Sequence, residues 1–427
     1  MAWPRSTIAG MDDYQGMDMI ELLLFDLDGT LLRTDDLEGF RGENGFGQKS
    51  SDWYQQLNNA FDRRQDRVHY TAQHLAQLAQ GRRLGVFTRS PRAYASTLLN
   101  KAYPGFPWSI VVAYEDVSKT KPHPEGVWLA MNKCGIDHPS KVAVVGDEKS
   151  DVLAAYQAGC CAFLDKGGWD PAGKTPQNYW TLERVPDMIL SGPNDLIGKI
   201  QNPIELLPEL ERAGQSKAKN YSPRFDAWKH ISPSGMNIRE GEFISVMGRI
   251  FSNYDELKYR SAWHQLTQEI ADNKDSVVFP DHWVETVRTF IRISWPVQHG
   301  RDTVVTVVPF KPGRPARLES FLSQLAASHA KFPISLQANI SFVPDVMSYN
   351  AGAKSHNKEH LDKVARFENV RDHLVVKRPS SISRKHVIVI DDVVTSGASL
   401  IYASKYMKAA GAHNVNCVAL AHAIGPQ

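Results

Sequence analysis

The first half of the chain alternates short apolar runs with stretches of helical spacing. Candidate strands cover residues 22–25, 84–88, 110–113, 142–145 and 162–164. Helical spacing follows at residues 74–78, 94–99, 126–134 and 152–158, and residues 195–200 close the region. Strands that alternate with helices in this way predict a doubly wound parallel sheet with helices on both faces.

The hydrophobic period fails between residues 201 and 235, where prolines, glycine, serine and lysines accumulate. Such a composition predicts a linker. A second set of elements follows. It has helical patterns at residues 254–271, 282–291 and 400–410, and strands at residues 304–308, 340–342, 387–390 and 415–420. We therefore expect an α/β protein with two doubly wound parallel-sheet domains.

The expected organisation is a leader at residues 1–19, a first domain at 20–200, a linker at 201–235 and a second domain at 236–427. The length of 427 residues suits two domains of roughly 100–200 residues each. The hydrophobic content of 42% is too high for a disordered chain. A net charge of +2 gives no field that would hold an extended polyanion, so we expect small phosphorylated partners and not nucleic acid.

The chain contains four cysteines and no Cys-x-x-Cys pair, which fits a reducing cytoplasm and argues against a disulfide framework or a zinc ribbon. No run approaches the roughly 20 apolar residues that a membrane helix needs. We expect a cytoplasmic protein without a membrane partner. A homodimer stays an alternative to a monomer.

Candidate chemistry begins where the first apolar strand ends, in Leu-Leu-Leu-Phe-Asp-Leu-Asp-Gly-Thr at residues 22–30. The turn at Gly29 can aim Asp26 and Asp28 into one crevice. One carboxylate of such a pair can attack phosphorus while the other protonates the leaving oxygen. The same pair, taken alone, also suits an ordinary turn at a strand end.

Three later segments add to this pair. Thr88 ends the second strand, where its hydroxyl can bind a phosphoryl oxygen; the alternative is a helix N-cap, for which Ser90 has an equal claim. The ammonium of Lys121 can offset phosphoryl charge, although a lysine in a loop is usually solvated. Asp147 and Asp151 follow a third strand at i and i+4, which suits Mg²⁺.

Together, these four segments resemble the haloacid dehalogenase superfamily of phosphohydrolases over residues 20–200. The resemblance implies that Asp26 is the nucleophile and Asp28 the general acid and base, and that Thr88 and Lys121 hold the phosphoryl group. It also implies a Mg²⁺ site at Asp26, the backbone carbonyl of Asp28, and Asp147, with Asp151 orienting the metal shell. The polar segment at residues 35–70 predicts a small cap or an open loop.

A second candidate site follows the strand at residues 387–390. Backbone N–H groups of the turn and the next helix can hold a phosphate, with hydroxyls as further donors, while two adjacent carboxylates suit ribose hydroxyls. A strand-to-helix connection with capping hydroxyls is the alternative, but it does not explain two acids after a buried strand. The site residues are Asp391, Asp392, Val393, Val394, Thr395, Ser396, Gly397, Ala398 and Ser399.

This segment resembles the 5-phosphoribosyl-1-pyrophosphate (PRPP) loop of type I phosphoribosyltransferases, and residues 240–425 more broadly resemble the ComF-like branch. The resemblance implies that Asp391 and Asp392 bind the ribose hydroxyls, and that Thr395 to Ser399 bind the 5-phosphate. Pyrophosphate would contact Lys311, Arg314 or Arg366, each of which also suits a solvated basic residue. The cysteine-rich ribbon of ComF-like proteins is missing, so no DNA-uptake function is carried over.

The leading hypothesis is a bifunctional, Mg²⁺-dependent enzyme of nucleotide metabolism. A phosphomonoester hydrolase, acting through an aspartyl-phosphate, is joined to a PRPP-dependent phosphoribosyltransferase. The partners are then PRPP, nucleotides and related phosphoribosyl metabolites. One alternative is a phosphatase that a non-catalytic PRPP- or nucleotide-sensing module regulates. Another is a nucleic-acid end-processing phosphatase, for which linker lysines and the cluster of Arg63, Arg64 and Arg67 are the support.

Overall fold

The computed structural model describes residues 20–41, 45–169, 185–201, 207–212, 222–230, 232–233, 242–252, 256–354 and 362–425. It divides into two compact units. Unit 1 comprises residues 1–206 and 251–264, and unit 2 comprises residues 207–250 and 265–427. The expected leader lies outside the described residues. Part of the expected linker, residues 207–212 and 222–230, is described and belongs to unit 2.

The sheet of unit 1 has the strand order β3-β2-β1-β4-β5-β6, and all its pairings are parallel. Its strands are β1 (Leu22–Phe25), β2 (Arg83–Phe87), β3 (Ile110–Val112), β4 (Val142–Gly146), β5 (Cys161–Asp165) and β6 (Met188–Leu190). β1, β4 and β5 are buried throughout, as strands covered on both faces must be. The sequence pattern found the first five strands and missed β6.

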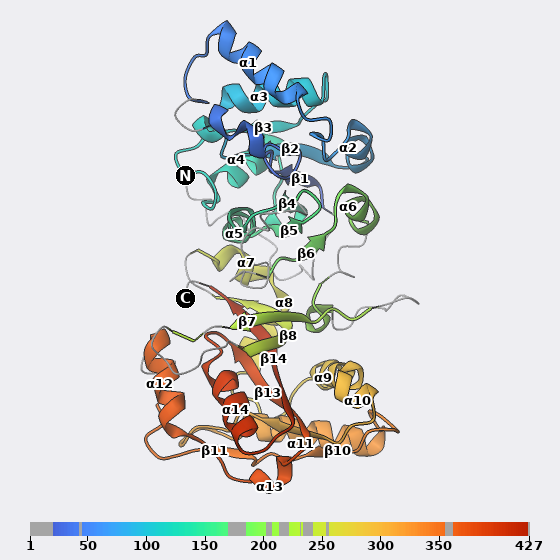
Figure 1. Cartoon of the computed structure of the whole chain (residues 1–427), viewed down its shortest axis with the longest axis vertical. Coiled ribbons are helices and arrows are strands. Elements are labelled where there is room, and N and C mark those ends of the chain that lie inside the picture. Colours follow the sequence, from blue (N-terminus) through green and yellow to red (C-terminus); the bar gives the residue numbers. More distant parts are fainter. Residues whose placement is uncertain are drawn as a thin grey trace. The chain divides into compact units, whose positions relative to one another are not determined.

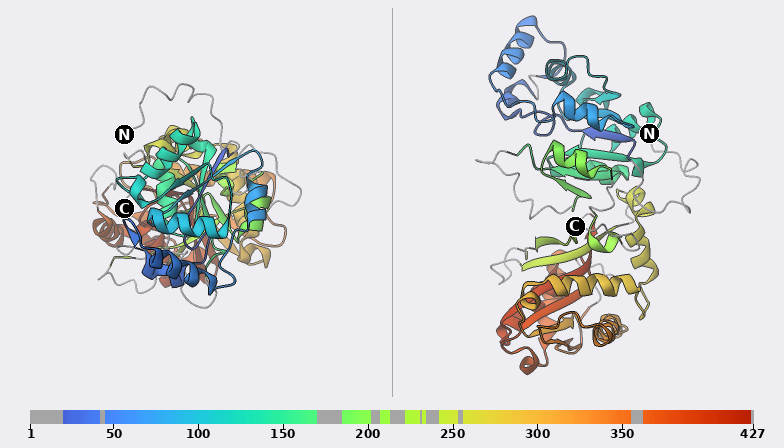
Figure 2. Two further views of the ribbon diagram at one scale, coloured as in Figure 1. Left: turned by 90° about the horizontal axis from the view of Figure 1, so that it is seen from above. Right: turned by 90° about the vertical axis from the view of Figure 1, so that its right-hand side faces the viewer.

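The helices of unit 1 lie on both faces of its sheet (Figure 2), as the alternating pattern predicts. α4 packs against α5, and α2 packs against α6. The helices are α1 (Ser51–Asp62), α2 (Ala72–Leu78), α3 (Arg92–Ala102), α4 (Glu125–Cys134), α5 (Lys149–Ala158), α6 (Pro193–Lys199) and α7 (Lys258–Trp263). α7 comes from the later segment of the chain and packs on α5.

The sheet of unit 2 has the order β10-β9-β13-β14-β8-β7. Its strands β13 and β14 run side by side (Figure 1). β10, β9, β13 and β14 pair in parallel, whereas β7 and β8 are antiparallel, so this sheet is mixed. The strands are β7 (Asp226–His230), β8 (Glu242–Phe251), β9 (Thr303–Val307), β10 (Ile340–Phe342), β13 (His386–Val394) and β14 (Asn414–Ile424). A separate antiparallel pair joins β11 (Met347–Tyr349) and β12 (Leu374–Val376).

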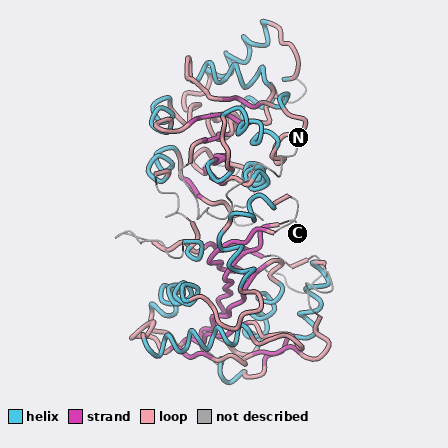
Figure 3. The backbone as a smooth tube through the Cα atoms, turned by 180° about the vertical axis from the view of Figure 1, so that it is seen from behind, coloured by secondary structure: helices cyan, strands magenta, loops and turns pink. Residues whose placement is uncertain are grey.

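The helices of unit 2 flank this sheet, and strands occupy the middle of each unit in Figure 3. They are α8 (Gln265–Asp272), α9 (Asp281–Ile293), α10 (Trp295–Gln298), α11 (Arg317–Lys331), α12 (Lys363–His373), α13 (Pro379–Ile382) and α14 (Ala398–Ala409). One core cluster joins Trp283 of α9 and Phe321 of α11 to Ile388 of β13. The architecture is thus α/β in both units.

The described part of the chain contains no helix that is both long enough and apolar enough to cross a bilayer. All four cysteines are buried and free of disulfides.

Candidate functional site

The first candidate site lies where the strands of unit 1 end. β1 pairs with β2 on one side and β4 on the other, so that Phe25 is level with Val86 and with Val145. Residues just beyond these positions therefore meet at one edge of the sheet. The structure brings together Asp26 after β1, Lys121, and the two carboxylates of Asp147 and Asp151 after β4.

Lys121 lies between two carboxylates. Its Nζ is 2.6 Å from Oδ1 of Asp26 and 2.7 Å from Oδ1 of Asp151, and its side chain is only 1% exposed. Burial alone would lower the pKa of Lys121, but the carboxylates of Asp151 and Asp26 outweigh it and raise the pKa above its usual value. This lysine is a fixed buried cation, in contrast to the solvated loop lysine that the sequence left open.

Asp26, Asp147 and Asp151 form a carboxylate triad in which one oxygen of each lies within 4.8 Å of the others. Burial raises the pKa of Asp26 to about 7; Lys121 opposes this shift, and Asp151 and Asp28 add to it. Burial, followed by the charges of Asp151 and Asp26, also raises the pKa of Asp147 well above its usual range. Crowded, buried carboxylates of this kind fit a divalent cation, which would relieve their repulsion.

The loop after β1 leaves space for this triad. Thr30 donates a hydrogen bond from Oγ1 to Oδ1 of Asp147 at 2.9 Å, which orients that carboxylate. Gly29 has a φ of +79°, and a Cβ at this position would lie 2.5 Å from Oδ2 of Asp147. Glycine is therefore required here for both its backbone angle and its size.

The carboxylate of Asp28 contacts residues other than those of the triad. Its carboxylate accepts hydrogen bonds from Oγ1 of Thr34 at 2.7 Å, Oγ of Ser90 at 2.5 Å and the hydroxyl of Tyr94 at 3.0 Å. Nη1 of Arg41 lies 3.7 Å from Oδ1 of the same carboxylate. The carboxylate of Asp28 is not part of the described triad.

Neither the side chain of Thr88 nor that of Ser90 caps the N-terminus of α3. α3 has Pro91 at its N-cap and no side-chain cap there. Thr88 is 1% exposed, and its Oγ1 accepts a hydrogen bond from the backbone N–H of Ser90 at 3.0 Å. Ser90 instead donates to Asp28, which gives it a place in the site that the sequence pattern did not indicate. A phosphoryl-binding role for Thr88 stays a prediction.

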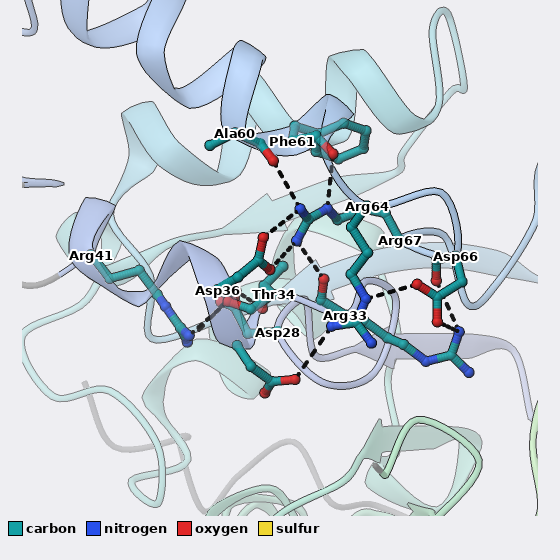
Figure 4. Close-up of polar contacts among 11 residues, drawn as sticks. Asp28, Arg33, Thr34, Asp36, Arg41, Ala60, Phe61, Arg64, Asp66 and Arg67 are labelled. Carbon is teal, nitrogen blue, oxygen red and sulfur yellow. Dashed lines mark hydrogen bonds and ion pairs between the residues drawn. The ribbon is translucent and has the colours of Figure 1, made fainter. Parts of the chain in front are cut away.

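The segment between the two motifs folds into a 3₁₀ helix (Asp35–Phe40) and α1. Arg67 organises it: its guanidinium donates to both oxygens of Asp36, at 2.5 and 2.8 Å, and to three backbone carbonyls (Figure 4). Arg64 pairs with Asp66 at 2.8 Å. Arg67 is 1% exposed, so it is not available to a polyanion.

The second candidate site lies where β13 meets α14. β13 is buried up to Ile390, and Asp391 and Asp392 follow within the strand. Gly397 is the N-cap of α14 with a φ of +77°, a left-handed conformation that glycine adopts at little cost. The loop therefore turns directly into a helix N-terminus, as phosphate binding requires.

The two adjacent acids differ in their surroundings. Burial raises the pKa of Asp391 well above its usual range, Asp392 adds to the shift, and the Lys311 ammonium opposes it. Asp392 is engaged within the protein: Oδ1 accepts from the N–H of Val393 at 2.7 Å, and Oδ2 lies 3.2 Å from Nη1 of Arg317.

The basic residues that the sequence proposed for pyrophosphate are not equivalent. Lys311 donates from Nζ to the carbonyl of Lys354 at 2.9 Å and lies over the ring of Tyr349. Arg366 donates to Oγ1 of Thr395 at 3.2 Å, which places it at the loop. Arg314 is exposed, and its backbone N–H bonds to the carbonyl of Lys311. Their role in binding pyrophosphate stays a prediction.

The sequence pattern did not predict two residues of this site. The hydroxyl of Tyr349, on β11, lies 3.4 Å from Oγ of Ser399, and Arg317 of α11 reaches Asp392. Neither has a motif around it, and both arrive from elements distant in sequence, so only the fold could reveal them.

Family models match both regions. Residues 41–164 match the haloacid dehalogenase-like hydrolase family, and residues 326–425 match the phosphoribosyl transferase domain. The chain therefore contains a haloacid dehalogenase-like hydrolase domain followed by a phosphoribosyl transferase domain. The first match begins after Asp26 and Asp28, and the second includes the whole loop from Asp391 to Ser399. The finer resemblance to ComF-like proteins stays a prediction.

Curated relatives match part of the chain. A phosphoglycolate phosphatase of Yersinia pseudotuberculosis is 36% identical over 95 residues, which are 22% of this chain and 40% of the relative. One of Photorhabdus laumondii is 32% identical over 139 residues, 32% of this chain and 55% of the relative. The chain thus spans about half the length of these relatives.

Solved structures also match part of the chain, at lower identity. A predicted phosphoglycolate phosphatase from Haemophilus somnus is 22% identical, with a TM-score of 0.31, over 44% of this chain and 100% of that one. A haloacid dehalogenase superfamily phosphatase from Thermococcus onnurineus is 19% identical, with a TM-score of 0.31, over 43% and 99%.

Proposed function

We propose that the chain is a bifunctional enzyme in which a Mg²⁺-dependent phosphomonoester hydrolase is joined to a PRPP-dependent phosphoribosyltransferase. The observation that supports the first activity most is the buried cluster of Lys121 with the triad of Asp26, Asp147 and Asp151. An ammonium and a divalent cation at this point would offset the charge of a phosphoryl group and let an anionic nucleophile approach it.

In this proposal Asp26 attacks phosphorus, the bond to the leaving oxygen breaks, and the proton for that oxygen comes from Asp28. Water then attacks the aspartyl-phosphate, Asp28 takes its proton, and the bond between phosphorus and Asp26 breaks. Thr34, Ser90 and Tyr94 hold the Asp28 carboxylate in position through their hydroxyls. Mg²⁺ held by Asp26, Asp147 and the neighbouring groups would supply charge neutralisation.

For the second domain, the support is the loop from Asp391 to Ser399 at the end of a buried strand. Its N–H groups, together with the hydroxyls of Thr395 and Ser399, suit the 5-phosphate of PRPP, and Asp391 suits a ribose hydroxyl. The hydrogen bond that Arg366 donates to Thr395 supports a role for this arginine in binding a phosphate group of PRPP.

A regulatory alternative has one observation in its favour. Both oxygens of Asp392 already have partners in Val393 and Arg317, which would leave this carboxylate fewer acceptor positions for ribose hydroxyls. PRPP binding without transfer would make the second domain a sensor that controls the phosphatase. The nucleic-acid alternative loses support, because Arg67 is committed to Asp36.

Two assays test the proposal on the full chain. Phosphate release from a panel of phosphomonoesters with Mg²⁺ tests the first site, and calorimetry with PRPP and Mg²⁺ tests the second. We expect phosphate release, and PRPP binding that Asp391→Asn weakens and the exposed-site control Asp281→Asn does not. Pyrophosphate release with an acceptor would establish transfer, whereas binding with altered phosphatase rate and no pyrophosphate would establish the sensor. No phosphate release and no PRPP binding would refute the proposal.

A further inference from the structure

Arg41 of the segment after β1 reaches the first site from the side of Asp28. It follows the 3₁₀ helix (Asp35–Phe40), and its guanidinium lies 3.7 Å from Oδ1 of Asp28 through Nη1. Nη2 donates to the carbonyl of Thr34 at 3.3 Å. Nε is buried and has no hydrogen-bond partner among the described residues. The Arg41 side chain as a whole is 28% exposed, so part of it is accessible to a ligand beside the candidate catalytic acid.

The 3₁₀ helix that precedes Arg41 is held by several contacts. The bidentate pair between Arg67 and Asp36 holds the 3₁₀ helix, and Arg67 also binds the carbonyls of Ala60 and Phe61 in α1 (Figure 4). α1 is tied to α3 by the ion pair of Lys101 with Asp62 at 2.8 Å. An arginine on such a supported element can recognise a ligand without first ordering its own segment.

The electrostatic neighbourhood of Arg41 includes both carboxylates of the proposed reaction. Burial would lower the pKa of Arg41, but the nearby acidic groups, chiefly Asp28, outweigh it and raise the pKa. Its positive charge is therefore permanent, and it lies within reach of the region where the substrate would bind.

Arg41 is not needed to hold Asp28 in place. Three hydroxyls already donate to that carboxylate at 2.5 to 3.0 Å, whereas the 3.7 Å separation from Nη1 is longer than a hydrogen bond. In the proposed function Asp28 protonates the leaving oxygen, so groups beside Asp28 face the leaving group and not the transferred phosphoryl group.

We propose that Arg41 is a specificity-determining residue that binds a second anionic group on the substrate, carried by the leaving group close to the scissile ester. This inference rests on the proposed phosphatase function. A guanidinium matches carboxylate and phosphate geometry equally, so the second anionic group of the substrate can be either a carboxylate or a phosphate. The preferred substrates are then small phosphomonoesters with two anionic ends.

Three two-carbon probes test this on full-length Asp26→Asn protein, which binds without turning over. They are 2-phosphoglycolate, with a carboxylate; ethylene glycol bisphosphate, with a second phosphate; and 2-hydroxyethyl phosphate, with a neutral end. With Mg²⁺ present, calorimetry should show one or both probes with a second anionic group binding about ten- to hundredfold tighter than the probe with the neutral end. The tighter of the two identifies the second anion.

Adding Arg41→Gln should remove that preference while binding of the neutral probe changes by less than about threefold. Arg41→Lys should retain part of it. Arg63→Gln, an exposed arginine of the same segment, should leave all three affinities unchanged. Equal weakening of all three probes by Arg41→Gln, or equal binding of the three by protein with Arg41 intact, would overturn the inference.

The assay separates this inference from the proposed function. If protein with Asp26 intact hydrolyses phosphomonoesters but shows no Arg41-dependent preference, the inference fails and the function stands. If it hydrolyses none but retains an Arg41-dependent preference in binding, the function fails and the anion site stands.

Discussion

At the scale of residues, the first site depends on a balance of buried charges. Three carboxylates crowd one edge of the sheet, and Lys121 contributes the single ammonium that the structure shows between two of them. Burying carboxylates in this way is costly unless a cation compensates them. The lysine compensates part of the charge, and the remainder favours a divalent metal.

Replacing Lys121 tests this balance. Lys121→Met removes the cation and leaves Asp26 and Asp151 facing one another, so we expect a loss of about 3–5 kcal/mol in the free energy of unfolding. Urea unfolding in the presence of a chelator measures it. Lys119→Met, at an exposed position nearby, is the matched control. Equal stability of the two variants would show that Lys121 does not compensate the triad.

The pH dependence of metal binding follows from the same groups. The pKa of Asp26 is raised to about 7 in the folded, metal-free protein, chiefly by burial, against 3.8 in the unfolded chain. The folded state thus binds the proton more tightly, and the stability that protonation confers is present below pH 3.8 and lost as the pH rises through about 7. Mg²⁺ competes with this proton.

We therefore expect Mg²⁺ to raise the melting temperature more at about pH 8 than at about pH 5.5. Differential scanning calorimetry with and without a chelator measures the shift. Asp147→Asn, which lacks one triad carboxylate, should reduce it at both pH values. A magnesium shift independent of pH would contradict the raised pKa.

The sequence identified the members of the triad because each follows a buried strand, and strands of a parallel sheet end at one edge. It missed the groups that surround Asp28. Thr34 and Arg41 come from one segment and Ser90 and Tyr94 from another, and a hydroxyl or guanidinium has no local signature that tells which carboxylate it will meet. Only the fold brings these two segments together around Asp28.

At the scale of elements, the apolar runs located most strands of both sheets, because a parallel strand that is buried on both faces is an uninterrupted run of apolar residues. β7 and β8 were missed. They lie at the antiparallel side of the second sheet, next to a region rich in proline and lysine, and the buried residues of β8 include Gly248 and Arg249, which interrupt its apolar run. The expected single helix at residues 254–271 is two helices, which belong to different units.

The first of these two helices, α7, is anchored in unit 1 by a buried ion pair. Nη2 of Arg260 lies 2.7 Å from Oδ1 of Asp187, and both side chains are at most 1% exposed. The guanidinium also lies 4.0 Å from the centre of the Trp263 ring, whose Nε1 donates to the carbonyl of Gly159 at 2.9 Å. α7 packs on α5, which carries Asp151 in its first turn.

Arg260→Met should therefore destabilise unit 1 by about 3–5 kcal/mol, because Asp187 stays buried without its partner. Urea unfolding monitored by tryptophan fluorescence measures the effect. The double variant Arg260→Met/Asp187→Leu removes both charges and should recover most of the loss. If the double variant is as unstable as the single one, the ion pair is not the source of the destabilisation.

At the scale of the whole molecule, the two candidate phosphate sites are built on two sheets by the same rule. In each, a buried parallel strand ends in carboxylates, and the following turn supplies a glycine at positive φ, Gly29 in one and Gly397 in the other. The chain also passes from unit 1 to unit 2, returns to unit 1 for residues 251–264, and then completes unit 2. Unit 1 thus includes residues that follow the first strands of unit 2 in the sequence.

The most direct test of the account is Mg²⁺-dependent phosphate release by the full chain compared with Asp26→Asn and with Asp52→Asn, an exposed-carboxylate control. If Asp26 is the nucleophile, Asp26→Asn should lower kcat by at least about a thousandfold, while PRPP binding and the activity of Asp52→Asn are unchanged. Phosphate release by Asp26→Asn at the rate of the unchanged protein would contradict the account.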